Sequence, residues 1–238
     1  MMARMVRIFI DFDGTITRED IGNELFRTFG DFDTIHDDLL AGSISVAEYY
    51  RRSCAALRID TTVEALRDFA EQQTVDASFP ALVRWCDANG LPLTVVSDGF
   101  RSYIDPILAR VDSSHLTVHC NTMERRNDVW QPDFPGASES CSCYCASCKR
   151  NVLLDTAGPD DVIVYIGDGH SDRCAAEHAD IIFAKGHLAA YCTANGIPHH
   201  SFKTLFEVLH VLRTRHEKRA FKQRRQAVLS RKRAFEEE

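Results

Sequence analysis

The sequence predicts an α/β fold, in which helices flank a parallel sheet and a helical bundle is inserted near the N-terminus. Three apolar runs rich in β-branched residues end directly in small polar or acidic residues, as buried strands do: Val6–Ile10, Leu93–Val96 and Val162–Ile166. Segments of helical pattern separate these runs, which favours parallel pairing. The 238 residues suffice for one such domain with an insertion.

Two carboxylates follow the first predicted strand, in the run Asp11-Phe12-Asp13-Gly14-Thr15. Ligands of an open α/β sheet bind at the carboxyl ends of its strands. Two acids this close repel each other unless a cation accompanies them. The pattern predicts a Mg²⁺ site whose first carboxylate, Asp11, can also attack phosphorus. A solvated turn rich in Asp and Gly is the alternative.

Some 80 residues separate the first two strands, which is too long for a plain crossover. Asp20 can cap a helix that stops at Gly30, and Ser45 and Thr61 each begin a capping-box pattern. We therefore expect a helical cap over residues 18–77, inserted into a core formed by residues 1–17 and 78–212.

The second strand ends in Ser97-Asp98-Gly99. A hydroxyl group and exposed backbone N–H groups at a strand end suit phosphate oxygens. A helix over 103–110, a strand near 116–121 and a β-hairpin or flap within 123–140 are expected to follow. Asp98 can alternatively cap the next helix.

The last long strand ends in Gly167-Asp168-Gly169, and a further acid, Asp172, follows four residues after Asp168. Carboxylates at this strand end supply further hard oxygen ligands for Mg²⁺. Lys149 precedes them at the start of a predicted helix. Its compact charge suits a site that holds phosphate and carboxylate together.

These four motifs, in this order, resemble the haloacid-dehalogenase superfamily of phosphoaspartyl phosphotransferases over about residues 6–212. The resemblance implies a Rossmann-like core with a helical cap that excludes water and selects the substrate. It also implies the roles of the motif residues. Asp11 would be the nucleophile, Asp13 the acid and base, and Lys149 the balancing charge, while Ser97 and Gly99 would bind phosphate; Mg²⁺ would lie between Asp11, the Asp13 carbonyl, Asp168 and Asp172.

Within the superfamily, the chain is similar to phosphoserine-phosphatase-like members and to one branch in particular, the methionine-salvage 2-hydroxy-3-keto-5-methylthiopentenyl-1-phosphate phosphatases. Like that branch, it has an acid, Asp20, nine positions after the nucleophile Asp11. It also has a cysteine-rich segment directly before Lys149, and residues 180–185 are similar to the corresponding stretch of that branch. This branch implies the methionine-salvage enol-phosphate as substrate, in a route of amino-acid biosynthesis.

Three acids are candidates for contact with that substrate. Glu19 and Asp20 lie on the cap side, where the alternative is that they stabilise a helix N-terminus. Asp98 stands where the branch usually has glycine. Phosphoserine phosphatases usually have glycine there too, whereas phosphoethanolamine/phosphocholine phosphatases resemble the chain at this position. An amine-bearing phosphomonoester of the latter kind therefore stays an alternative substrate, and the resemblance to phosphoserine-phosphatase-like members keeps phosphoserine as another.

The nine cysteines, without a signal peptide, indicate reduced thiols and a cytoplasmic protein. Four of them lie within eight residues and allow a structural zinc site. Reduced or redox-active thiols are the alternative. The four residues are Cys141, Cys143, Cys145 and Cys148.

The net charge of −7 divides into −13 over residues 1–212 and +6 over the basic C-terminal extension 213–238. We expect this extension to be a solvated helix or a frayed terminus, with contact to an anionic surface as the alternative. The acidic body argues against nucleic acid as a main partner, and no apolar run is long enough to cross a membrane. A non-catalytic binding protein with the same fold is the alternative function of another class, and the oligomeric state stays open.

Overall fold

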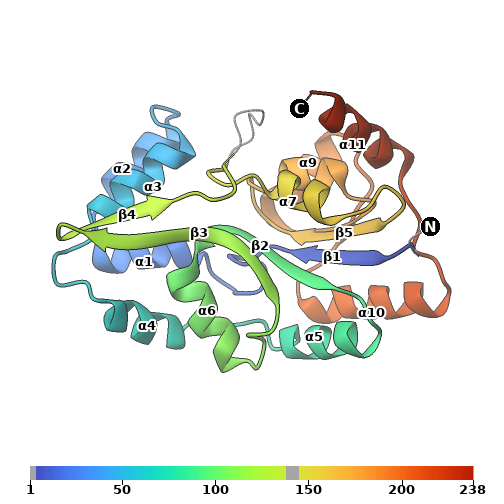
Figure 1. Ribbon diagram of the computed structural model, residues 1–238, viewed down its shortest axis with the longest axis horizontal. Helices are drawn as coiled ribbons and strands as arrows, with labels where there is room; N and C mark the ends of the chain where they lie inside the picture. Colours follow the sequence, from blue (N-terminus) through green and yellow to red (C-terminus); the bar gives the residue numbers. More distant parts are fainter. Residues whose placement is uncertain (1–3, 138–144, 238) are drawn as a thin grey trace.

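The computed structural model, which describes residues 4–137 and 145–237, contains a seven-stranded sheet in the order β4-β3-β2-β1-β5-β6-β7 (Figure 1). All neighbouring strands are parallel except β3 and β4, which form an antiparallel hairpin. The predicted α/β fold is therefore confirmed. The strands are β1 (Val6–Ile10), β2 (Leu93–Phe100), β3 (Thr117–Arg126), β4 (Val129–Asp133), β5 (Val162–Gly167), β6 (Ile181–Ala184) and β7 (His200–Ser201).

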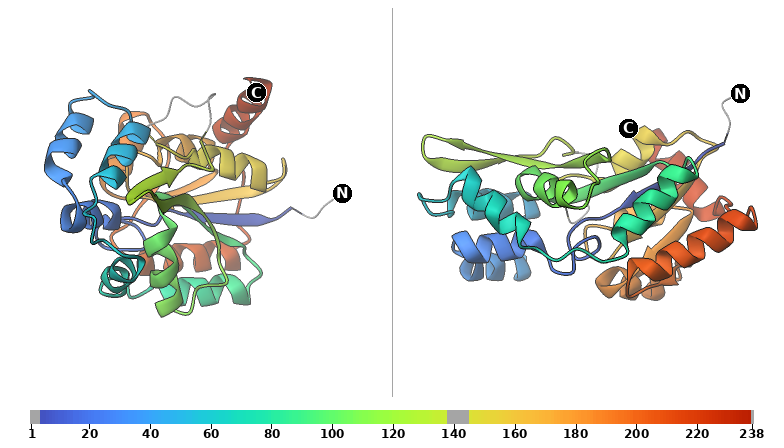
Figure 2. Two further views of the ribbon diagram at one scale, coloured as in Figure 1. Left: turned by 60° about the vertical axis from the view of Figure 1, so that its left-hand side comes forward. Right: turned by 90° about the horizontal axis from the view of Figure 1, so that it is seen from below.

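Helices cover both faces of this sheet, because alternate residues of its central strands point to opposite sides. Ile8 and Ile10 of β1 join one buried cluster, while Phe9 between them joins the other. The first cluster includes α5 (Phe79–Ala88) and α10 (Leu205–Glu217), which lie side by side (Figure 2). The second includes α7 (Lys149–Thr156), α8 (Arg173–His178) and α9 (Gly186–Ala194). The result is a three-layer core.

Four helices follow β1 before the chain returns to β2: α1 (Ile21–Phe29), α2 (Phe32–Leu40), α3 (Val46–Ala55) and α4 (Val63–Glu71). Asp20 caps α1 and Ser45 caps α3 as predicted, each accepting a hydrogen bond from a backbone N–H three residues on. The cap of α4 is Thr62 rather than Thr61. The helices expected in this segment are therefore present.

The β3–β4 hairpin extends beyond the core and lies beside α3 (Figure 1). The indole Nε1 of Trp130 donates to the carbonyl of Thr61 at 3.3 Å, and Arg125 donates to the carbonyl of Ile59 at 2.8 Å. The α6 helix (Arg101–Arg110) packs against α4. The predicted hairpin thus exists, but its first strand is continuous with the strand expected near 116–121. The hairpin fastens core residues to the inserted helices.

The expectation of a solvated C-terminal extension is wrong. The helix α11 (Arg225–Glu237) packs on α8, and Ala227 and Arg231 are buried. Apolar residues are sparse in this helix, as the sequence indicates. Two guanidinium groups hold the C-terminal segment against α8 instead. Arg231 donates to the carbonyl of His178 at 2.6 Å, and Arg224 donates to the carbonyls of Ala176, Glu177 and Ala179. These cations satisfy the carbonyl groups left open at the C-terminus of α8.

Among the helices of the described residues, none has the length and apolar character that a membrane crossing requires.

Candidate active site

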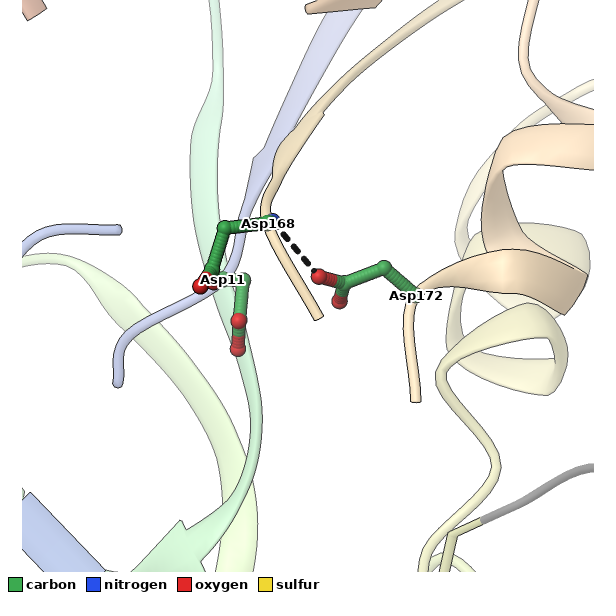
Figure 3. Close-up of side chains that lie close together, drawn as sticks. All are labelled: Asp11, Asp168 and Asp172. Carbon is green, nitrogen blue, oxygen red and sulfur yellow. Dashed lines mark hydrogen bonds between the residues drawn. The ribbon is translucent and has the colours of Figure 1, made fainter. Parts of the chain in front are cut away.

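The C-terminal ends of β2, β1 and β5, which are neighbours in the sheet, bring the predicted motifs together. The backbone N–H of Asp11 donates to the carbonyl of Ile166 at 2.9 Å, which fixes the first motif against the last. Figure 3 shows the carboxylates of Asp11, Asp168 and Asp172 gathered at this edge. One oxygen from each lies within 4.8 Å of the others.

Lys149 joins two of these carboxylates. Its ammonium nitrogen lies 2.6 Å from Asp11 Oδ1 and 2.7 Å from Asp172 Oδ1, and the side chain is only 3% exposed. Burial alone would lower the pKa of Lys149, but the two carboxylates raise it above its usual range. Lys149 is therefore a permanent cation beside the predicted nucleophile.

The pKa of Asp11 lies well above its ordinary value, because burial and then the charge of Asp172 disfavour ionisation. Lys149 offsets only part of this effect. Burial and Asp172 likewise raise the pKa of Asp168, whose Oδ1 accepts a hydrogen bond from Thr15 at 2.9 Å. Three acids face one cation here, so a further positive charge would stabilise the ionised site.

Asp172 has all its acceptor positions in use. Its Oδ1 accepts from Lys149 and from the Tyr165 hydroxyl at 2.5 Å. Its Oδ2 accepts from the backbone N–H groups of Asp168 and Gly169, both at 2.8 Å. A carboxylate with four donors has no lone pair left for a metal ion. Asp172 therefore orients Lys149 and the Asp168 loop, and could reach an ion only through water.

Three oxygens fit a Mg²⁺ ion better. Asp11 Oδ2 and Asp168 Oδ2 accept no hydrogen bond from any residue that the structure describes, and the same holds for the backbone carbonyl of Asp13. Hard carboxylate and carbonyl oxygens are the ligands that Mg²⁺ takes, with water completing the shell. The residues present thus fit this ion.

Asp13 lies beside the cluster in a different environment. Its Oδ1 accepts from the backbone N–H of Ile21 at 3.0 Å, and its Oδ2 accepts from the hydroxyls of Tyr103 at 2.8 Å and Ser97 at 3.3 Å. Burial, followed by the charge of Asp20, raises the pKa of Asp13 to about 7. A carboxyl group with this pKa can both donate and accept a proton near neutral pH.

Glycines make room for these carboxylates. A methyl group on Gly14, whose φ is +70°, would lie 2.6 Å from Asp168 Oδ2. One on Gly167 would lie 2.5 Å from Asp172 Oδ2. One on Gly99 would lie 2.5 Å from Asp13 Oδ2 and 1.8 Å from the Tyr103 hydroxyl. Each glycine thus lets one acid approach the backbone of the site.

The remaining predicted residues have protein partners. Ser97 Oγ accepts from the N–H of Gly99 at 2.9 Å and donates to Asp13. Asp20 accepts from the backbone and side chain of Asn23, as a helix cap does. The carbonyl of Glu19 accepts from the N–H of Gly14, while its side chain is exposed. The helix-cap alternative for Asp20 agrees with these contacts.

The carboxylate of Asp98 binds groups of the protein itself and not a position open to a substrate. Its buried carboxylate accepts from the backbone N–H groups of Ala146 and Ser147 and from the amide of Asn121. It does not cap the following helix α6 with its side chain either. Both interpretations of Asp98 made from the sequence therefore need correction: the acid serves the loop that precedes Lys149.

Two of the four clustered cysteines, Cys141 and Cys143, lie outside the described residues. Cys145 and Cys148 are described, but the one group of metal-ligating side chains found within residues 4–137 and 145–237 is the aspartate cluster. The described residues therefore give the zinc site no support.

Tyr103 and Tyr165 belong to the site but were not predicted from the sequence. Tyr103 lies on α6 and Tyr165 within β5, and both side chains are fully buried. The only signal available was a phenol in an otherwise apolar, buried segment, since such a hydroxyl needs a partner.

The sequence matches the haloacid dehalogenase-like hydrolase family over residues 8–177. A 2-hydroxy-3-keto-5-methylthiopentenyl-1-phosphate phosphatase of Geobacillus kaustophilus is 31% identical over 215 residues, covering 89% of this chain and 97% of the relative. The enzyme of the same name from Brevibacillus brevis is 26% identical, with 89% and 96% covered. A substrate-bound phosphoserine phosphatase structure superposes with a TM-score of 0.67 at 17% identity, covering 88% of this chain and 99% of that one, which indicates a shared fold.

Proposed function

The chain belongs to the haloacid dehalogenase-like hydrolase family, and from this premise we propose that it hydrolyses 2-hydroxy-3-keto-5-methylthiopentenyl-1-phosphate through a phosphoaspartyl intermediate. It is a phosphoric monoester hydrolase. The observation that carries the proposal is the buried pair of Asp11 and Lys149 beside Asp13, an acid with a pKa of about 7. The names of the relatives support the substrate.

In the first step Asp11 attacks phosphorus, and the bond between phosphorus and the leaving oxygen breaks. Protonated Asp13 transfers its proton to that oxygen, so the alcohol departs neutral. In the second step the Asp13 carboxylate takes a proton from water, whose oxygen attacks phosphorus. The bond to Asp11 then breaks, and inorganic phosphate is released.

Asp11, Asp168 and the Asp13 carbonyl would hold Mg²⁺, which would neutralise charge on the transferred phosphoryl group. Lys149 balances the charge that develops on the same oxygens. Ser97 and the N–H of Gly99, which hydrogen-bond to Asp13 and to Ser97 respectively, would exchange these bonds for bonds to the phosphate, and Asp172 keeps Lys149 in position.

We further propose that residues 18–77 act as a cap on a core of residues 1–17 and 78–212. The two linkers of this cap pair with each other. Arg18 donates through its N–H to the carbonyl of Thr74 at 3.1 Å, and Asp76 does so to Ile16 at 2.8 Å. A paired double linker suits a cap that moves as one body and excludes water during the reaction. A small phosphorylated metabolite in the cytoplasm is the partner that fits this arrangement.

Phosphate release from a panel of phosphomonoesters, with Mg²⁺ and with EDTA, tests the proposal. The panel holds the methionine-salvage enol-phosphate, phosphoserine, phosphoethanolamine and phosphocholine. We expect Mg²⁺-dependent release with the highest kcat/KM for the enol-phosphate and no need for an added acceptor. A higher kcat/KM for phosphoserine, phosphoethanolamine or phosphocholine would refute the enol-phosphate as the substrate. If the folded protein releases no phosphate from any compound of the panel, the result would favour the non-catalytic alternative.

Asp11→Asn tests the nucleophile. It should abolish phosphate release and spare folding. Asp161→Asn is the matched control, because Asp161 is an equally buried acid, paired with Arg7 at 2.7 Å, at the opposite end of β5. Unchanged turnover by Asp11→Asn would refute the assignment.

A further inference from the structure

We infer that Asp98 is a positioning residue, which anchors the backbone just before α7 and thereby sets the place of Lys149 between Asp11 and Asp172. The inference rests on the proposed function, because Lys149 must act in the reaction for its position to matter. It assigns Asp98 to the enzyme's own loop rather than to the substrate.

The contacts of the carboxylate carry this inference. Asp98 Oδ1 accepts from the N–H of Ser147 at 2.9 Å and from the N–H of Ala146 at 3.0 Å, and Oδ2 shares the latter at 3.0 Å. Asp98 is 7% exposed, and Ala146 and Ser147 are equally buried. Hydrogen bonds from backbone N–H groups to an ionised acceptor are the strong kind. Two successive peptide groups are thus fixed by one side chain.

Asn121 of β3 closes the network. Its amide nitrogen donates to the backbone carbonyl of Asp98 at 2.6 Å and lies 3.3 Å from Oδ1. Its amide oxygen accepts from the hydroxyl of Ser147. Asn121 has no exposed surface. The amide therefore holds both ends of the contact between β2 and the loop, and it satisfies polar groups that would otherwise be buried without partners.

The anchored peptides lie next to the functional group. Ser147 is two residues before Lys149, the first residue of α7. The intervening Cys148 donates through its backbone N–H to the carbonyl of Gly136 at 2.7 Å, and the N–H of Gly136 donates to Ser147 Oγ at 3.3 Å. A shift of the 146–147 backbone would therefore disturb the peptide groups that lead directly into α7. Ser97, on the other side of Asp98, contacts Asp13. Asp98 thus ties the phosphate-binding strand end to the lysine loop.

The same contacts argue against recognition of a substrate amine. Oδ1 already has three donors and Oδ2 has one, all from the protein. A cationic substrate group would have to displace bonds that hold the loop. We therefore expect substitution of Asp98 to slow amine-bearing and amine-free substrates by the same factor.

The test compares Asp98→Ala, Asp98→Asn and Asn121→Ala with the wild-type enzyme. Misplacing a catalytic group by about 1 Å can cost about 100-fold in rate. We expect kcat to fall at least about tenfold in Asp98→Ala, less in Asp98→Asn, with KM within about threefold. Asp180→Asn is the matched control, because Asp180 is a buried acid that also anchors backbone N–H groups, those of Ile163 and Arg224, away from the site. Its kcat should stay unchanged.

Two further measurements distinguish a displacement of Lys149 from a general loss of protein structure. In a Lys149→Met background, Asp98→Asn should change the residual rate by less than about twofold, since both substitutions disable the same group. Amide hydrogen exchange at Ala146 and Ser147, which needs no activity, should accelerate in Asp98→Asn and not in Asp180→Asn. Additive effects with Lys149→Met, unchanged exchange, or a KM increase confined to amine substrates would overturn the inference. Lack of turnover by the wild-type enzyme would instead count against the proposed function.

Discussion

Gly99→Ala introduces one methyl group where the site has no room for it. The new Cβ would lie 1.8 Å from the Tyr103 hydroxyl and 2.5 Å from Asp13 Oδ2. Van der Waals contact requires roughly 3.5 Å, so the phenol must move by roughly 1.7 Å. Tyr103 has no exposed surface, so it cannot swing into solvent. The hydrogen bond that orients Asp13 must therefore break or lengthen.

We expect kcat to fall by about 100-fold, which corresponds to about 2.7 kcal/mol of lost transition-state stabilisation. Overpacking should also lower the free energy of unfolding, by about 1–3 kcal/mol. Steady-state phosphate release under saturating Mg²⁺ gives the first quantity, and urea unfolding of the same preparation gives the second.

Gly90→Ala provides the control. Gly90 has a φ of +62°, but a methyl group there would meet no atom within 4 Å. This variant should lose about 1 kcal/mol of stability through backbone strain and keep its kcat. If Gly99→Ala retains kcat within about threefold of wild type, the close packing of Gly99, Tyr103 and Asp13 does not govern the reaction, and the reasoning fails.

Three further predictions concern residues that the sequence did not single out. Tyr165→Phe removes one of the four donors to Asp172, so kcat should fall roughly tenfold with little change in KM; an unchanged kcat would contradict a role for this phenol. Arg231→Ala should cost about 3 kcal/mol in urea unfolding, because it leaves buried acceptors on α8 and Asp180, while kcat stays unchanged. Burial lowers the pKa of His178 from 6.5, so the folded protein binds fewer protons than the unfolded chain just below that pH. Stability should therefore fall as the pH drops below about 6.5, and less steeply in His178→Asn; equal pH dependence in urea unfolding would refute this.

The strand ends of the site were predictable because two independent signals coincide there. A buried parallel strand is a short β-branched run, and acids such as Asp11 and Asp168 that follow it directly must lie at the ligand-binding edge. Parallel order then brings distant motifs together without further information. The start of α1 was predictable for a similar reason, since Asp20 is a strong N-cap residue in its ordinary place.

Contacts made across the core were not predictable. Asn121 is an unremarkable polar residue in a strand, and its role exists only because β3 pairs with β2 beside the lysine loop. Asp98 seemed available to a substrate because its donors come from residues 146–147, far along the chain. The C-terminal helix was misjudged because apolar spacing measures hydrophobic packing alone. Arg224 and Arg231 dock it instead through carbonyl groups of α8, which no periodicity reveals.

Three acids at or beside this site, Asp13, Asp172 and Asp98, accept hydrogen bonds from backbone N–H groups. The N–H of Ile21 binds Asp13, those of Asp168 and Gly169 bind Asp172, and those of Ala146 and Ser147 bind Asp98. Backbone donors have no rotamer freedom of their own, so each of these three acids is oriented by the path of the backbone that binds it. The spacing within each motif therefore fixes loop geometry as well as residue identity. An inserted residue between Asp168 and Asp172 should consequently be more damaging to kcat than Tyr165→Phe, because it removes two donors at once rather than one.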